Sequence, residues 1–263
     1  MSEAISGRGS GPASAPPGGP ILRVRGLSKR FGGVHAIENV DFDLDRGEVL
    51  AIAGDNGAGK STLIKTISGV HAPSAGEVWL RGASITFTSP REARAAGIET
   101  IYQDLALADN LDVGANVFLG RERMRRRFGI FPALDRKAMR AEAARVVETL
   151  DIAMPRVDLP VRALSGGQRQ AVAIGRAIFW NAEVLIMDEP TAALGVPEQR
   201  KVVALIKGLR AAGKAVIFIS HNLGDIFAVA DRILVLRRGR KAGERRAAET
   251  DGDEIVRLIV GSA

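Results

Sequence analysis

The sequence has no cysteine. A disulfide framework, a metal site built on thiolates and a cysteine nucleophile are therefore all excluded. A long apolar run is also missing, because the longest apolar stretches, 171–180 and 233–236, are too short or too interrupted to cross a bilayer. The first twenty residues are mostly Gly, Ser, Ala and Pro and contain no apolar segment typical of a secretory signal. We therefore interpret residues 1–20 as a disordered leader and expect a cytoplasmic protein.

Aromatic residues are scarce, at 5% of the chain, and no aromatic-rich strand accompanies the basic residues. The net charge is +7, which by itself raises nucleic acid and anionic lipid as partners. Part of this charge falls on one short stretch, at Arg121, Arg123, Arg125, Arg126 and Arg127. The stretch is either a solvated segment or a contact for a membrane subunit or lipid head groups. Without an aromatic-rich strand or a DNA-binding motif, no nucleic acid partner is expected.

The 263 residues are 46% hydrophobic and 25% charged, as in a soluble protein with a substantial core. This length suits one large α/β domain or one domain with an inserted subdomain. Hydrophobic patterning predicts strands at 21–24, 37–44, 48–53, 76–82, 98–102, 184–190, 215–219 and 233–236, and helices at 135–150, 165–177, 197–212 and 253–260. Between 104 and 164 the pattern becomes helical around a basic loop, which indicates a helical subdomain inserted into the core.

A phosphate-binding loop follows the strand expected at 48–53. Its residues fit the pattern G-x-x-x-x-G-K-[S/T] and are Gly54, Asp55, Asn56, Gly57, Ala58, Gly59, Lys60, Ser61 and Thr62. The glycines permit left-handed backbone angles and leave room for a phosphate beside the loop amides. The helix that follows directs its free N–H groups at the same anion. Lys60 can reach the β- and γ-phosphates and the Ser61 hydroxyl can ligate Mg²⁺, so the chain is predicted to bind a nucleoside triphosphate.

Two acids and a histidine end two other buried strands. Asp188 and Glu189 follow the apolar run 184–187, and His221 follows the run 215–219. In open α/β sheets ligands lie at the carboxyl ends of the strands. Asp188 can therefore hold the Mg²⁺ shell, and Glu189 can orient or deprotonate the attacking water. A lone histidine is more often structural, but this position allows a contact between His221 and the γ-phosphate.

A second anion-ready helix start lies in the run Leu164, Ser165, Gly166, Gly167 and Gln168. A serine and two glycines at the beginning of a helix leave free N–H groups open to a phosphate. The chain's own loop already supplies one site for a triphosphate. This second site indicates that the phosphate of another molecule docks here.

These motifs make the sequence resemble the nucleotide-binding subunits of ATP-binding cassette (ABC) transporters. The resemblance covers the chain from about Ile21 to its end. Its six motifs occur in the order of the family: the aromatic Phe31, the phosphate loop, Gln103, the L-S-G-G-Q signature at 164–168, the pair Asp188 and Glu189, and His221. It implies an α/β fold of the P-loop NTPase type over residues 21–263, with an N-terminal antiparallel β subdomain and an inserted α-helical subdomain at about 104–164.

The resemblance also implies roles for these residues. Phe31 would stack on the adenine, and the signature residues Ser165, Gly166, Gly167 and Gln168 would contact ATP bound to a second subunit. Gln103 would join Ser61 and Asp188 around Mg²⁺ and couple the metal to the helical subdomain. Glu189 would polarise the water and His221 would contact the γ-phosphate. The partners implied are ATP, a second nucleotide-binding subunit and transmembrane permease subunits, at the cytoplasmic face of the inner membrane.

Two details resemble one branch of the family, the bacterial importers of fructose, ribose and xylose. The segment 191–196 has Gly195 where most members carry an aspartate, and the segment 99–103 reads E-T-I-Y-Q. Many such ATPases fuse two cassettes, whereas this sequence holds one with every motif intact, so a homodimer is expected. A periplasmic sugar-binding protein would take part indirectly. The alternatives are an exporter ATPase with the same chemistry and a soluble cassette ATPase that acts on DNA or ribosomes.

Overall fold

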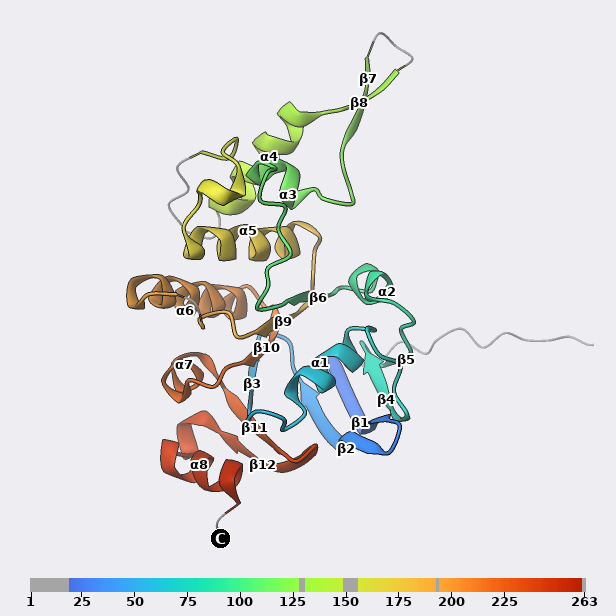
Figure 1. Ribbon diagram of the computed structural model, residues 1–263, viewed down its shortest axis with the longest axis vertical. Coiled ribbons are helices and arrows are strands. Elements are labelled where there is room, and N and C mark those ends of the chain that lie inside the picture. The colour runs from blue at the N-terminus through green and yellow to red at the C-terminus, as the bar shows by residue number, and fades with distance from the viewer. Residues whose placement is uncertain (1–18, 128–130, 149–155, 193, 262–263) are drawn as a thin grey trace, which may run out of the picture.

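The computed structural model describes residues 19–127, 131–148, 156–192 and 194–261. The expected disordered leader, residues 1–20, lies almost wholly outside these ranges. Figure 1 shows two sheets with helices around them, and a helical region at the upper end of the molecule. No helix in the described part of the chain combines the length and the apolar character needed to span a bilayer.

The central sheet has six strands in the order β12-β11-β3-β10-β9-β6 (Figure 1). Their bounds are β3 Val49–Ala53, β6 Ile98–Ile101, β9 Val184–Asp188, β10 Ala215–Ile219, β11 Arg232–Arg237 and β12 Arg240–Arg246. All neighbours pair in parallel except β12, which is antiparallel to β11. The loops that follow β3, β10, β9 and β6 therefore leave the sheet at the same edge, where the predicted site residues begin.

Both faces of this sheet are buried. Along β3, Leu50 and Ile52 belong to one apolar cluster, whereas Val49, Ala51 and Ala53 belong to another. Alternate side chains point to opposite faces of a strand, so β3 separates two cores. Continuous apolar runs are typical of parallel strands that are covered on both sides, which is why the sequence revealed these strands readily.

One of these cores lies against a second, antiparallel sheet of order β2-β1-β4-β5. Its strands are β1 Leu22–Phe31, β2 Val34–Leu44, β4 Ala75–Leu80 and β5 Ala83–Ile85. Helices α1 Lys60–Ile67 and α2 Pro90–Ala95 adjoin it. The other core is covered by α5 Gly166–Phe179, α6 Val196–Ala211, α7 Leu223–Val229 and α8 Gly252–Val260.

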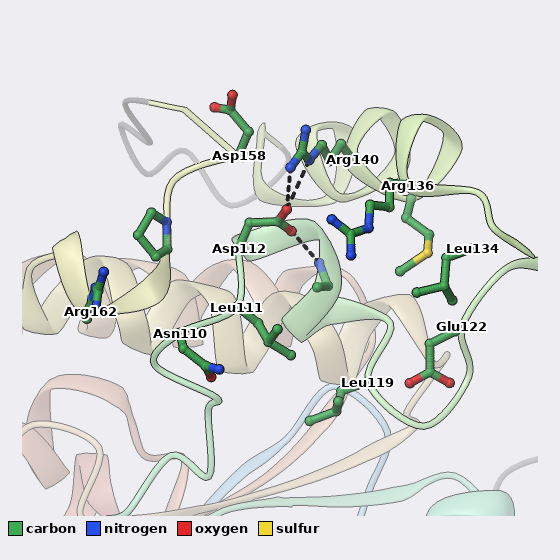
Figure 2. Close-up of a pocket in the computed structure, with 13 residues that line it drawn as sticks. Asn110, Leu111, Asp112, Leu119, Glu122, Leu134, Arg136, Arg140, Asp158 and Arg162 are labelled. Atoms are coloured by element: carbon green, nitrogen blue, oxygen red, sulfur yellow. Dashed lines mark hydrogen bonds and ion pairs between the residues drawn. The ribbon is translucent and has the colours of Figure 1, made fainter.

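The helical region has a small core of its own around Val117, Phe118, Met139 and Val172. It contains α3 Val113–Val117, the hairpin strands β7 Met124–Arg127 and β8 Phe131–Leu134, α4 Arg136–Glu148 and a single 3-10 turn, η1 Val161–Ala163. Asp112 fixes α3 against α4, because it accepts hydrogen bonds from the Ala115 N–H at 2.7 Å and from the Arg140 guanidinium at 2.6 and 3.0 Å. Beside this pair lies a cavity of about 380 Å³ (Figure 2).

The sequence analysis did not assign the strands β5, β7, β8 and β12 or the short helices α2, α3 and α7. The stretch 121–127 was interpreted as a basic loop, but residues 124–127 form a strand of a hairpin. That interpretation was wrong because β7 is almost entirely arginine and has no apolar alternation to mark it. For the same reason β12, with the sequence RKAGERR, carries little pattern. Charged side chains of this kind suit an edge strand, which has to avoid pairing with other chains.

Candidate functional site

The phosphate loop connects the carboxyl end of β3 to the N-terminus of α1. Gly54, Gly57 and Gly59 have φ angles of 155°, 77° and 103°, a region that L side chains rarely enter. At Gly54 a Cβ would lie 2.4 Å from the Leu236 carbonyl oxygen, and at Gly59 2.7 Å from that of Ala36. Both glycines are therefore required by close backbone approaches as well as by conformation.

Beside the loop lies a cavity of about 450 Å³. It is lined by Val34, His35, Ala36, the loop residues 55–62, Arg238 and Gly239. Lys60 turns back toward the loop, where its Nζ donates to the Gly54 carbonyl at 2.7 Å and to the Asp55 carbonyl at 3.0 Å. The cavity thus combines a helix N-terminus with a lysine, which is the chemistry of a phosphate site.

Phe31, predicted to stack on an adenine, is the last residue of β1 and is 46% exposed. Its ring meets His71 edge to face at 5.1 Å. It is not among the described residues that line the loop cavity, which on this side are Val34, His35 and Ala36. Sequence reasoning missed these three, along with Arg238 and Gly239, because none of them belongs to a recognisable motif.

The predicted catalytic acid and histidine meet at the same sheet edge. Asp188 ends β9, and Glu189 follows with a φ of 53°, an uncommon value for a residue with a side chain. The Glu189 N–H donates to the Ile219 carbonyl at 2.9 Å, which ties this turn to the end of β10. Glu189 Oε2 lies 2.8 Å from His221 Nδ1. A strained residue held by a neighbouring strand is a common feature of functional sites.

Electrostatics link Asp188 to the phosphate loop. Burial raises the pKa of Asp188 above its ordinary value of 3.8, and the negative charge of Glu189 raises it further. Lys60 and Lys65 oppose both effects without cancelling them. A carboxylate whose charge is this poorly compensated favours the arrival of a cation. A cation bound beside Asp188 would lower this pKa, because it would stabilise the charged form of the carboxyl group.

A buried hydrogen bond supports the turn after the two acids. The Thr191 hydroxyl donates to Asp225 Oδ2 at 2.7 Å, and both residues are buried. Asp225 lies in the first turn of α7, shortly after His221. This bond therefore joins the segment carrying Glu189 to the segment carrying His221. No local pattern predicts it, because the two residues come together only in the folded sheet.

Gln103 follows β6, which pairs with β9 so that Ile101 lies opposite Met187. It therefore leaves the sheet next to Asp188. On the same strand Glu99 is buried, and burial raises its pKa although Arg176, Arg94 and Arg121 lower it. Arg176 comes from α5 and donates to the carbonyls of Ala106 and Leu105 at 3.3 and 3.4 Å. This cluster joins the Gln103 segment to the helical region and was missed by sequence reasoning.

The signature residues form the start of α5. Ser165 caps the helix in a capping box, with its hydroxyl accepting from the Gln168 N–H and the Gln168 side chain accepting from the Ser165 N–H. A Cβ added to Gly166 would lie 2.7 Å from Leu194, and one on Gly167 would lie 3.2 Å from Glu198. Both glycines thus pack against the entry to α6. None of the four signature residues, 165–168, lines the cavity beside the chain's own phosphate loop.

The candidate magnesium ligands are the Ser61 hydroxyl, the Gln103 amide and the Asp188 carboxylate. Within the described ranges no group of three or more acidic or histidine side chains could hold a metal alone. Mg²⁺ prefers oxygen donors and commonly takes one or two carboxylates together with substrate phosphates and waters. A single carboxylate with two neutral oxygen donors therefore fits Mg²⁺ brought by a nucleotide.

Comparison with known proteins agrees with these motifs. The family described as ABC transporter matches residues 37–192. A xylose/arabinose import ATP-binding protein from Sulfolobus acidocaldarius is 45% identical, covering 92% of this chain and 95% of its own length. A fructose import ATP-binding protein from Rhizobium meliloti is 52% identical over 84% and 86%. A ribose import ATP-binding protein from Rubrobacter xylanophilus is 47% identical over 94% of this chain but only 47% of its own.

Solved structures confirm the expected fold class. A nucleotide-free ATP-binding cassette from an ABC transporter superposes with a TM-score of 0.77 at 27% identity, covering 92% of this chain and 95% of that one. A dimeric post-hydrolysis cassette bound to ADP and Pi has a TM-score of 0.71 at 26% identity, over 86% and 98%. The two sheets and the added helical region are thus an architecture found in ATP-binding cassettes.

Proposed function

The chain belongs to the ABC transporter family, and from this premise we propose that it is the ATP-hydrolysing subunit of a monosaccharide importer. The observation that carries the proposal is its high identity to proteins named for the import of xylose or arabinose, fructose and ribose. These names favour the importer over an exporter or a soluble cassette. The enzyme class is ATP hydrolysis coupled to solute transport.

In this proposal the loop 54–62 binds the phosphates of ATP. When ATP binds, Lys60 exchanges its two carbonyl partners for oxygens of the β- and γ-phosphates. Hydrogen bonds from a charged donor to a charged acceptor are stronger than those between neutral groups. When bound with ATP, Mg²⁺ would supply positive charge that offsets the negative charge on the phosphates. Ser61, Gln103 and Asp188 would hold Mg²⁺, and Phe31 would stack on the adenine of ATP.

Glu189 acts on the water that attacks the γ-phosphate. Its carboxylate lies beside the His221 imidazole at the sheet edge that also carries the phosphate loop and Asp188. Glu189 can orient the water or accept its proton, while His221 contacts the γ-phosphate. The bonds from the Glu189 N–H to Ile219 and from Thr191 to Asp225 hold this turn in place.

A second copy of the chain completes each site. The signature residues 165–168 do not line the chain's own loop cavity, and the first turn of their helix can take a phosphate. We propose that two copies stack with each ATP between one loop and the partner's signature. A dimeric cassette bound to ADP and Pi is among the similar structures. We also propose that the ATPase domain spans residues 21–263 and that its helical subdomain spans about 104–164.

The remaining partners follow from the importer assignment. Transmembrane permease subunits would contact the helical region, and a periplasmic sugar-binding protein would deliver the solute without touching this chain. The protein would then work as a peripheral subunit at the cytoplasmic face of the inner membrane. Closure on ATP and reopening after hydrolysis would drive the permease through its differential affinity for two states.

Transport measurements test the proposal. In a strain lacking this protein, uptake of labelled fructose, ribose, xylose, galactose and myo-inositol would be compared with wild type. We expect one sugar to be lost, and its uptake to return with the wild-type gene but not with Glu189→Gln. Unchanged uptake across the whole panel would contradict monosaccharide import. ATPase activity of the purified protein would then show separately whether the hydrolase assignment stands.

A further inference from the structure

The β7–β8 hairpin extends away from the rest of the fold at the upper end of the molecule (Figure 1). Its two strands form a sheet of their own and pair with no other strand in the described part of the chain. An isolated two-stranded hairpin is marginally stable in water, so such hairpins usually pack against something. Nothing in the proposed ATPase chemistry uses this element.

The base of the hairpin is fixed to the helical region. Arg123 Nη1 pairs with Glu142 of α4 at 2.7 Å, and the guanidinium of Arg121 stacks over the Trp180 ring at 4.6 Å. Leu134, at the end of β8, lines the cavity beside α4 together with Met139 (Figure 2). The hairpin is therefore presented outward from a defined base.

Charge is concentrated on this element. Strand β7 carries Arg125, Arg126 and Arg127, and neither β7 nor β8 contains an acidic residue. Within the described part of the chain, no carboxylate pairs with Arg125 or Arg126, and both are exposed. These two guanidinium groups can therefore bind an external anion without breaking an existing ion pair.

Large apolar side chains are exposed on the same hairpin. Met124 is 57% exposed, Phe131 63% and Leu134 41%. Met124 lies opposite Leu134 across the two strands, so these two share one face, and Phe131 belongs to the other. Exposed apolar side chains interleaved with arginines are typical of elements that lie in the interface of a membrane with anionic lipids.

We propose that the β7–β8 hairpin binds the surface of an anionic phospholipid bilayer. Arg125 and Phe131 lie on the same face of the hairpin, so this face would turn to the bilayer. Phe131 would enter the boundary with the acyl chains, while Arg125 and the neighbouring Arg126 would contact lipid phosphates. A bilayer fits better than a folded protein, because a hairpin that has basic and apolar side chains but no acidic ones matches a uniformly anionic surface over an apolar layer. The inference does not depend on which solute the proposed importer carries.

Vesicle binding tests this directly. The full-length protein would be mixed with phosphatidylcholine vesicles that contain or lack phosphatidylglycerol, and binding measured by co-sedimentation at several salt concentrations. We expect binding to the anionic vesicles only, and weaker binding as salt screens the charges. The double variant Arg125→Ala/Arg126→Ala should bind them roughly ten- to thirtyfold more weakly, given the usual contribution of basic residues near a membrane surface.

Two further variants separate the hairpin from general charge effects. Lys201→Ala/Lys207→Ala removes the same charge from exposed positions on α6 and should leave binding within about twofold of wild type. Phe131→Ser keeps the net charge and should still weaken binding, because the ring would no longer enter the bilayer. ATPase activity should be unchanged in every variant, since none touches the nucleotide site.

Three results would overturn the proposal. Equal binding to neutral and anionic vesicles would remove the role of the arginines, and undiminished binding by the hairpin variants would place the lipid contact elsewhere. The third result is that the wild type binds no vesicles but co-purifies with its permease, and that this co-purification is lost in Arg125→Ala/Arg126→Ala. The hairpin would then bind the permease instead of lipid.

Discussion

At the scale of single residues, the phosphate-loop lysine is held ready by its own loop. Lys60 donates to two backbone carbonyls, of Gly54 and Asp55, and both contacts can be exchanged for phosphate oxygens. We expect Lys60→Ala to weaken ATP binding about ten- to hundredfold, the size of a hydrogen bond to a charged group. Titration with a fluorescent ATP analogue would measure this. Lys207→Ala, on exposed α6, serves as a control, and equal affinity of the two variants would contradict the assignment.

A second residue-scale prediction concerns pH. Burial raises the pKa of Glu244, but hydrogen bonds from Lys241 and Arg232 outweigh it, so the pKa lies below its ordinary value of 4.5. A lowered pKa stabilises the fold above the unfolded-state value, and this stability disappears as pH falls through the folded-state value. Glu244→Gln should therefore lower the free energy of unfolding by about 2 kcal/mol at neutral pH.

The difference between wild type and Glu244→Gln should shrink below pH 4.5. Urea unfolding at a series of pH values would show it. Glu249, which is 69% exposed and 4.0 Å from Arg246, provides a matched control, because Glu249→Gln should change stability little at any pH. If the free energy of unfolding differed between wild type and Glu244→Gln by the same amount down to low pH, the ion pairs of Glu244 would not be the source of that difference.

At the scale of helices, replacing glycine by alanine should change the free energy of unfolding in opposite directions at two positions. A Cβ on Gly114 of α3 would lie 2.9 Å from Arg140 Cγ and 3.1 Å from its Cα, whereas one on Gly208 of α6 would meet nothing within 4 Å. Gly114→Ala should lower the free energy of unfolding by about 1 kcal/mol through overpacking. Gly208→Ala should raise it by about 0.5–1 kcal/mol through helix propensity. Urea unfolding of both would compare them, and equal signs would contradict the packing of α3 on α4.

At this scale too, the sequence was informative where strands and helices are apolar. The core strands β3, β9 and β10 were expected because they are continuous apolar runs. The helices α4, α5 and α6 were expected because their apolar side chains repeat with a helical period. The hairpin β7–β8 and the edge strand β12 were missed because charged side chains dominate them. The bond between Thr191 and Asp225 escaped for another reason, since tertiary folding alone brings distant residues together.

At the scale of the whole molecule, the proposed dimer is testable. Glu189→Gln should bind ATP without hydrolysing it, so the closed state should accumulate. Light scattering should give a mass of twice 27.9 kDa for this variant with Mg²⁺ and ATP, and the monomer mass without nucleotide. Adding Lys60→Ala to the same variant should restore the monomer. A monomer under all conditions would contradict completion of the site by a second copy.

The strand order has a consequence for how the protein is made. β3 lies between β10 and β11, yet β3 ends at Ala53 whereas those neighbours begin at Ala215 and Arg232. During translation β3 therefore waits for its partners, for roughly ten to thirty seconds at ordinary rates of synthesis. The helical region is complete before then and can fold on the ribosome from local contacts. The ATP site, in contrast, closes only when the last strands of the sheet emerge, so a prematurely terminated chain has no nucleotide site.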